Sequence, residues 1–157
     1  MVNLSRIIKW SVIGSVLAAL PYSLQVIISY FITSSSASAD YLTGIALISI
    51  FLGIIIFAIQ CIVYLIIGFF GQSGKDELIE VCIIGGFSGL LTSVLMALAN
   101  LISGIYSGIF SYRQDVLAFL GVYLALALGF NLIIMFVVGM FSTLVGHLVK
   151  HYLFVKK

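Results

Sequence analysis

Four long runs of apolar residues divide the chain, and short polar stretches separate each run from the next. The runs cover about 7–33, 42–70, 75–111 and 116–154. A helix needs about 20 apolar residues to cross the hydrocarbon core of a bilayer, which is roughly 30 Å thick, and every run is long enough. The pattern therefore predicts an all-α integral membrane bundle of four transmembrane helices, with residues 1–157 forming a single domain.

The composition favours lipid as the main solvent of this chain. Hydrophobic residues make up 63% of its 157 residues and charged residues only 8%. A water-soluble domain is usually about half apolar, so too little polar surface is present here to cover a globule in water. The net charge is only +2, and no basic face indicates binding to nucleic acid. We expect a multi-pass protein of the cell membrane whose immediate surroundings are the lipid bilayer.

The first run resembles a secretory signal peptide, because basic residues precede it and the small residues Ala37-Ser38-Ala39 follow it. However, its apolar part exceeds 20 residues, whereas the apolar region of a signal peptide usually has about 7 to 15. We therefore expect a retained first helix. Pro21 lies inside this run and predicts a kink, because proline removes a backbone donor and crowds the preceding turn.

The fourth run is longer than one perpendicular crossing of the membrane requires. At about 1.5 Å per residue, a helix over 116–154 must tilt, kink or protrude. Gly129, beside Asn131, is the expected position of a kink. The alternative is a short re-entrant piece over 116–130 followed by a separate span.

The distribution of lysine and arginine predicts the orientation of the bundle. With four spans and a cytoplasmic amino terminus, only Arg113 falls on the outer side. The inner side then holds Arg6, Lys9, Lys75, Lys150, Lys156 and Lys157. Basic residues concentrate on the cytoplasmic side of membrane proteins, so both termini are expected in the cytoplasm.

The two halves of the chain show traces of an internal repeat. A shift of 71 residues superposes Gly14 on Gly85 and Gly68 on Gly139. It also superposes Tyr41 on Tyr112 and Gln60 on Asn131. Overall identity under this shift is close to that expected by chance, so a two-hairpin repeat is a hypothesis supported mainly by these landmarks.

A stripe of small or weakly polar residues runs along the third predicted helix at steps of three or four. Its members are Gly85, Gly89, Ser93, Ala97, Asn100, Gly104, Gly108 and Ser111. Membrane helices pack where small side chains let their backbones approach, so the stripe predicts a helix-packing surface. A shorter stripe on the fourth helix, formed by Gly121, Ala125 and Gly129, is the expected mate. The pattern leaves open whether the third helix packs within this chain or against another subunit.

Few polar side chains lie within the predicted spans. The amide-bearing ones are Gln25, Gln60, Asn100 and Asn131. An unpaired amide is costly in hydrocarbon, so these residues are expected to face the bundle and to bond to one another or to backbone carbonyls. No aspartate, glutamate, lysine or arginine lies near the middle of a span, which disfavours a proton-coupled or ion-coupled carrier.

The cysteines and histidines do not indicate a metal site or a cofactor. Cys61 and Cys82 lack the CxxC spacing of redox or zinc motifs. His147 and His151 are four residues apart, but no third ligand stands nearby in the sequence. Together with Lys150, they predict a basic juxtamembrane cluster that contacts anionic headgroups.

The expected function follows from extensive packing surface without an ionisable core. We expect a non-catalytic subunit that packs in or scaffolds a larger membrane complex, with other membrane subunits or further copies of itself as partners. One alternative is a small homo-oligomeric channel or facilitator whose pore is lined by Asn100, Ser93, Asn131 and Gln60. Another is a membrane-shaping or virion-envelope protein. Enzyme activity is the least expected class.

Overall fold

The computed structural model describes residues 4–34, 39–71, 78–106 and 114–155, which are helical almost throughout. The helices are α1 (Leu4–Ser34), α2 (Ala39–Phe70), α3 (Leu78–Tyr106) and α4 (Gln114–Lys150), and α4 leads into a short π-helix, His151–Val155. Each of the four α-helices contains a segment long and apolar enough to cross a membrane. The prediction of an all-α, multi-pass membrane protein is confirmed at this level.

The helix bounds differ from the predicted runs mainly at the ends. The first two helices begin three residues earlier than expected, at Leu4 and Ala39. For the third run, residues 72–77 and 107–113 lie outside the described ranges. The fourth run is one continuous α-helix that passes through Gly129, rather than a re-entrant piece and a separate span. Pro21 lies within α1, whose helical hydrogen bonding continues on both sides of it.

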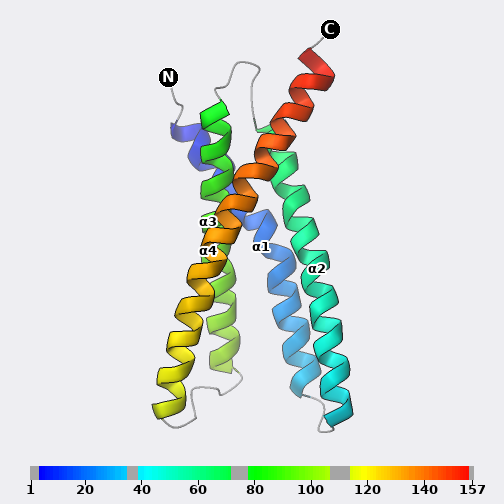
Figure 1. The fold of residues 1–157 in the computed structure, drawn as a ribbon, viewed down its shortest axis with the longest axis vertical. Helices are drawn as coiled ribbons and strands as arrows, with labels where there is room; N and C mark the ends of the chain where they lie inside the picture. Colours follow the sequence, from blue (N-terminus) through cyan, green and yellow to red (C-terminus); the bar gives the residue numbers. More distant parts are fainter. Residues whose placement is uncertain (1–3, 35–38, 72–77, 107–113, 156–157) are drawn as a thin grey trace.

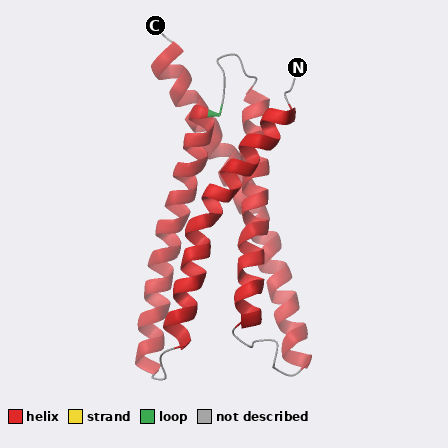
Figure 2. Ribbon diagram, turned by 180° about the vertical axis from the view of Figure 1, so that it is seen from behind, coloured by secondary structure: helices red, strands yellow, loops and turns green. Residues whose placement is uncertain are grey.

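The four helices exchange neighbours along the length of the bundle. Helix α1 begins and the π-helix finishes at one end of the bundle, which we call the terminal end. At the opposite end, which we call the hairpin end, α1 leads to α2 and α3 leads to α4. Figure 1 shows α4 starting beside α3 at the hairpin end, crossing it, and finishing beside α2. Figure 2 shows the two hairpins well separated at the hairpin end. Helix α1 packs against both α3 and α2, so the helices surround the core in the order α1, α3, α4, α2.

The centre of the bundle is more polar than its surface. The largest fully buried side chains include only two aliphatic residues, Ile84 and Val81. The others carry hydroxyl, phenol or amide groups: Tyr64, Gln60, Thr92, Thr143, Ser88 and Ser93. Long apolar side chains are instead exposed on all four helices, as expected where hydrocarbon is the solvent.

Hydrogen bonds join three helices around this polar centre. The Tyr64 hydroxyl donates to Thr92 Oγ1 at 2.7 Å, and the Thr92 hydroxyl donates to the Ser88 carbonyl at 2.8 Å. Gln60 Nε2 lies 3.1 Å from the Ala18 carbonyl and 3.5 Å from Met96 Sδ. Lipid offers no competing partners for these groups, so the bonds stabilise the approach of α2 to α1 and α3.

Replacing Tyr64 by phenylalanine tests this network. The change leaves Thr92 without its phenol donor in the core, and hydrogen bonds between membrane helices contribute about 0.6 kcal/mol on average and up to about 1.7. We expect Tyr64→Phe to lower the free energy of unfolding within this range, as measured by steric trapping or denaturant titration in bicelles.

The control is Tyr22→Phe, which removes an exposed hydrogen bond to Asn100 Oδ1, 2.9 Å long. Its effect should remain within about 0.5 kcal/mol, as is usual for surface substitutions. Equal losses for the two variants would contradict the assignment of the stabilising network to the buried centre.

Candidate functional site

Helices α3 and α4 approach each other closely where they cross, and glycines form the contact. An added Cβ at Gly85 would overlap the Gly139 carbonyl group and the Thr143 hydroxyl. An added Cβ at Gly89 would overlap the Met135 carbonyl group. Backbones that meet in this way gain dispersion contacts along several turns, which is the main source of helix association in lipid. The crossing is therefore a specific packing contact between α3 and α4.

A second close approach joins α4 to α2 nearer the terminal end. Gly68 lies against the backbone of Thr143, and Gly146 lies against the backbone of Leu65. Successive turns of α4 thus present Gly139, Thr143 and Gly146 to two different helices. Gly139 contacts α3, Gly146 contacts α2, and Thr143 contacts both helices. The angles at which α4 crosses α3 and α2 are therefore both constrained.

Thr143 lies where these contacts meet, and its side chain is fully buried. Its hydroxyl is 2.8 Å from the Gly139 carbonyl, 3.0 Å from the Met140 carbonyl and 3.4 Å from the Val81 carbonyl. A hydroxyl has one proton, so it donates to one of these carbonyls at a time. The two nearer carbonyls belong to the preceding turn of α4, which shields the hydroxyl from the apolar surroundings.

The predicted stripe on the third helix divides between two environments. Gly85, Gly89 and Ser93 are buried, and the Ser93 hydroxyl donates to the Asn131 carbonyl of α4 at 3.1 Å. Ala97 is half-buried, while Asn100 is exposed and accepts a hydrogen bond from Tyr22. The surroundings of Gly104, and the residues Gly108 and Ser111, lie outside the described part of the chain.

Gly85 and Gly89 contact α4 at positions beyond the predicted mate Gly121, Ala125 and Gly129. An added Cβ at Gly129 would have no atom within 4 Å, and the surroundings of Gly121 and Ala125 are not described. The contacts of α3 are made by Met135, Gly139 and Thr143 instead. Sequence reasoning missed this set, although Gly139, Thr143 and Gly146 also recur at steps of four and three and so carry a comparable signal.

The four amide side chains within the spans differ in burial. Gln60 is buried in the core, Gln25 and Asn131 are half-buried, and Asn100 is exposed. The hydrogen bond from Ser93 uses the backbone carbonyl of Asn131 rather than its side chain. Gln60 and Asn100 each bond to a group on another helix of the bundle.

Charged side chains gather at the terminal end of the bundle. The Arg6 guanidinium donates from Nε and Nη2 to the Gly71 carbonyl, at 3.1 and 3.0 Å. This carbonyl follows directly after α2, where the helix dipole favours a cation. Glu80 lies in the first turn of α3 and is only 5% exposed. Its Oε1 atom has no hydrogen-bond partner among the described residues, a feature that the sequence alone did not reveal.

The histidines and cysteines are placed without a chelating arrangement. The rings of His147 and His151 have centroids 6.4 Å apart and are tilted by 48°. Within the described ranges, no group of three or more His, Cys, Asp or Glu side chains is close enough to hold a metal ion. Cys61 and Cys82 are half-buried free thiols.

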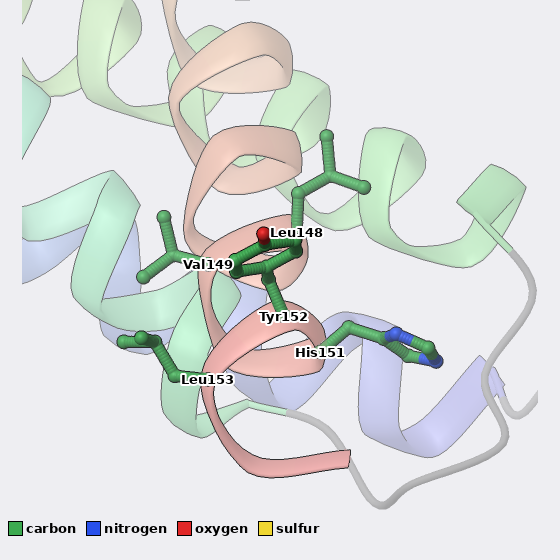
Figure 3. Close-up of a pocket in the computed structure, with 5 residues that line it drawn as sticks. All are labelled: Leu148, Val149, His151, Tyr152 and Leu153. Atoms are coloured by element: carbon green, nitrogen blue, oxygen red, sulfur yellow. The ribbon is translucent and has the colours of Figure 1, made fainter. Parts of the chain in front are cut away.

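A depression of about 450 Å³ lies at the end of α4 and along the π-helix. It is lined by Leu148, Val149, His151, Tyr152 and Leu153. Figure 3 shows that all five side chains come from this one helical end, with His151 on one side of it and Leu153 on another. The depression is therefore a feature of a protruding helix end rather than an enclosed site between helices.

Comparisons with protein-family models, curated proteins and solved structures find no match to this chain.

Gly89→Leu tests the importance of the crossing. A leucine side chain cannot fit against the Met135 backbone, so α3 and α4 must separate, and overpacking of this kind typically costs about 1–3 kcal/mol. We expect a loss at the upper end of this range in the free energy of unfolding measured in bicelles. Gly129→Leu is the matched control, because open space surrounds that position, and it should change stability by less than about 0.5 kcal/mol. A tolerated leucine at position 89 would contradict the crossing.

Proposed function

We propose that this protein is a non-catalytic subunit that packs in or scaffolds a larger assembly in the cell membrane. The observation that carries the proposal is the use of the buried polar groups. Gln60, Tyr64, Ser93 and Thr143 all bond to neighbouring groups of the bundle and not to a common cavity. Such a centre holds helices together, whereas a transport pathway would need polar groups directed at a solute.

The surface available to a partner differs from the one expected from the sequence. The buried part of the α3 stripe packs on α4 of the same chain, so that part is not available to another subunit. Helix α2 is the candidate that we choose, because it carries the most apolar of the four spans, Ile50–Phe70, and only 22% of an 18-residue window in it is buried, the same share as in α4 and less than half that in α3. Gly53 lies on this span with no atom within 4 Å of an added Cβ. Ser49 stands four residues earlier, so a small-xxx-small pair is present there.

A homo-oligomeric channel receives less support from the geometry. Of its expected lining residues, Gln60 and Ser93 already bond to protein groups, and Asn100 is exposed beside Tyr22. A membrane-shaping or envelope protein remains an outcome of the experiment below, because such a protein would bind further copies of itself through the same face of α2.

The proposal includes an orientation with both termini in the cytoplasm. Helix α1 begins and the π-helix ends at the same end of the bundle (Figure 1), and the lysine and arginine distribution favours the cytoplasm for that end. It also includes an origin by duplication of a helical hairpin. The superposed glycines support this origin, because Gly14, Gly85, Gly68 and Gly139 all lie at contacts between helices.

Photo-crosslinking from position 53 tests the partner surface. A photoreactive amino acid placed there in the native membrane should give one discrete crosslinked product, identified by mass spectrometry, and native mass spectrometry in mild detergent should show the same companion. Gly53→Leu should abolish the companion without loss of bundle stability, whereas Gly129→Leu should retain it. A stable monomer with no crosslink at position 53 would contradict the scaffold proposal.

Reporter fusions test the orientation. Green fluorescent protein fused after residue 157 should fluoresce in a bacterial host, and alkaline phosphatase at the same position should be inactive, because phosphatase needs the oxidising periplasm. Fusions after residue 36 should give the reverse result. Active phosphatase at the carboxyl terminus would reverse the proposed orientation.

A further inference from the structure

The end of α4 and the π-helix extend past the neighbouring helices at the terminal end of the bundle. Thr143 of α4 lies beside Val81 of α3, and Gly146 lies against Leu65 of α2. Helix α3 begins three residues before Val81 and α2 ends five residues after Leu65, whereas nine residues follow Gly146 up to Val155. The end of this segment therefore stands beyond both neighbours (Figure 1).

The depth of this segment places it among lipid headgroups. The apolar span Leu128–Phe154 has 27 residues, or about 40 Å at 1.5 Å per residue. The usual tilt of about 20° shortens it only slightly, and the hydrocarbon core is only roughly 30 Å thick. Arg6 and Trp10 both lie at Gly71, directly after α2, and basic and tryptophan side chains are typical of the cytoplasmic membrane interface. The residues beyond Gly71 therefore lie in the headgroup layer.

The large side chains of this segment are exposed, although most of them are apolar. The exposed fraction is between 50% and 70% for Leu148, Tyr152, Leu153 and Phe154. The Phe154 ring packs edge-on against Phe69 of α2, with ring centroids 5.7 Å apart, which holds the π-helix at the end of α2. Apolar side chains at this depth gain contact with the glycerol and upper acyl region of lipids, which keeps them from water.

The same segment is basic. Lys150 and His151 stand where α4 leads into the π-helix, and Lys156 and Lys157 follow in the sequence. No aspartate or glutamate occurs in the sequence after Asp115. His151 is exposed and borders the depression described above, and its ring carries an N–H donor in either neutral tautomer. An anionic group is therefore the complementary ligand.

A phospholipid supplies both kinds of contact from the layer in which the segment lies. The depression, about 450 Å³ in volume, has the aliphatic side chains Leu148, Val149 and Leu153 in its wall and His151 as its basic member (Figure 3). A ligand that fits it combines an apolar body with an anionic group. An acidic peptide would match the charge but not the apolar wall, and a zwitterionic lipid would match the wall but brings no net negative charge.

We propose that the end of α4 and the π-helix bind one anionic phospholipid, such as phosphatidylglycerol. The phosphate lies at His151 and Lys150, and the glycerol and first methylene groups lie against Val149 and Leu153. Phosphatidylcholine and phosphatidylethanolamine carry a cation beside the phosphate, which weakens their attraction to basic side chains. The site is separate from the partner surface of α2, so it does not depend on the proposed scaffold function.

The experiment uses the full chain in nanodiscs of three compositions. These are phosphatidylcholine alone, phosphatidylcholine with phosphatidylglycerol, and phosphatidylcholine with phosphatidylethanolamine. Native mass spectrometry of the released protein counts the lipids that stay bound. The wild type should retain one phosphatidylglycerol in preference to the other two lipids.

Two substitutions remove the groups assigned to the phosphate. His151→Phe keeps a ring but removes the N–H donor, and it should lower the preference about tenfold, the effect of one lost hydrogen bond to a charged group. Lys150→Gln should lower it about fivefold, since a basic residue near an anionic surface contributes about 1 kcal/mol. The control is Lys9→Gln, which removes an exposed positive charge from α1 at the same end of the bundle. It should keep the preference of the wild type, and an equal loss in all three variants would show only a general attraction to a basic end.

Two tryptophan variants separate the depression from the rest of the lipid-facing surface of α4. Val149→Trp fills the depression and should abolish the preference for phosphatidylglycerol. Val137→Trp is the matched control, because Val137 is exposed to a similar extent (40% against 38% for Val149) and does not line the depression. It should retain the lipid as the wild type does.

Thermal unfolding distinguishes a binding role of His151 from a structural one. In lipid-free detergent, His151→Phe should unfold at the temperature of the wild type, because the side chain is exposed. Added phosphatidylglycerol should raise the unfolding temperature of the wild type more than that of His151→Phe. Equal retention of the three lipids by the wild type would overturn the proposal. An unchanged preference in His151→Phe, with loss of an acidic protein companion from the native membrane complex instead, would overturn it in favour of a protein ligand.

Discussion

Lipid neither competes for hydrogen bonds nor drives apolar helices together, and the arrangement of this bundle depends on that constraint. In water, burying leucine and isoleucine would hold four helices together. In hydrocarbon those side chains gain little by turning inward, so stability must come from close backbone contact and from polar groups that have no partner outside the protein. This constraint explains why the fully buried side chains here are mostly hydroxyls and an amide, while long aliphatic side chains cover the outside.

Close glycine contacts and side-chain hydrogen bonds connect different pairs of helices, and they have different consequences. Glycine contacts join α4 to α3 and to α2, where backbones touch and little adjustment is possible without separating the helices. The hydrogen bonds of Tyr64 and Gln60 join α2 to α1 and α3. Helix α4 is thus held mainly by close backbone contact, whereas α2 is held by both kinds of contact. Each of the four helices therefore has at least two neighbours to which it is held specifically.

The sequence predicts the number, type and approximate length of the helices because each depends only on local hydrophobicity over about 20 residues. It predicts less about which residues meet. A period of 3.6 residues identifies a face of α3 but not the height at which α4 crosses it, so the sequence does not predict that Gly85 and Gly89 meet Met135, Gly139 and Thr143. Asn100 was expected inside the bundle. It lies about 30 Å along α3 from Glu80, close to the opposite limit of the span, where exposure costs less and Tyr22 supplies a donor.

The burial of Glu80 illustrates why charge at a helix end is hard to interpret from sequence. In the first turn of α3, a glutamate is usually exposed and favoured by the helix dipole. Here the bundle covers it, and the dipole alone does not replace the hydrogen bond that water would give to Oε1. A buried carboxylate at the boundary of a membrane span therefore differs from the buried hydroxyls of the core in the hydrogen-bond partners that it needs. Thr92 and Thr143 can donate to carbonyls of their own helices, whereas a carboxylate must obtain its donor from another group.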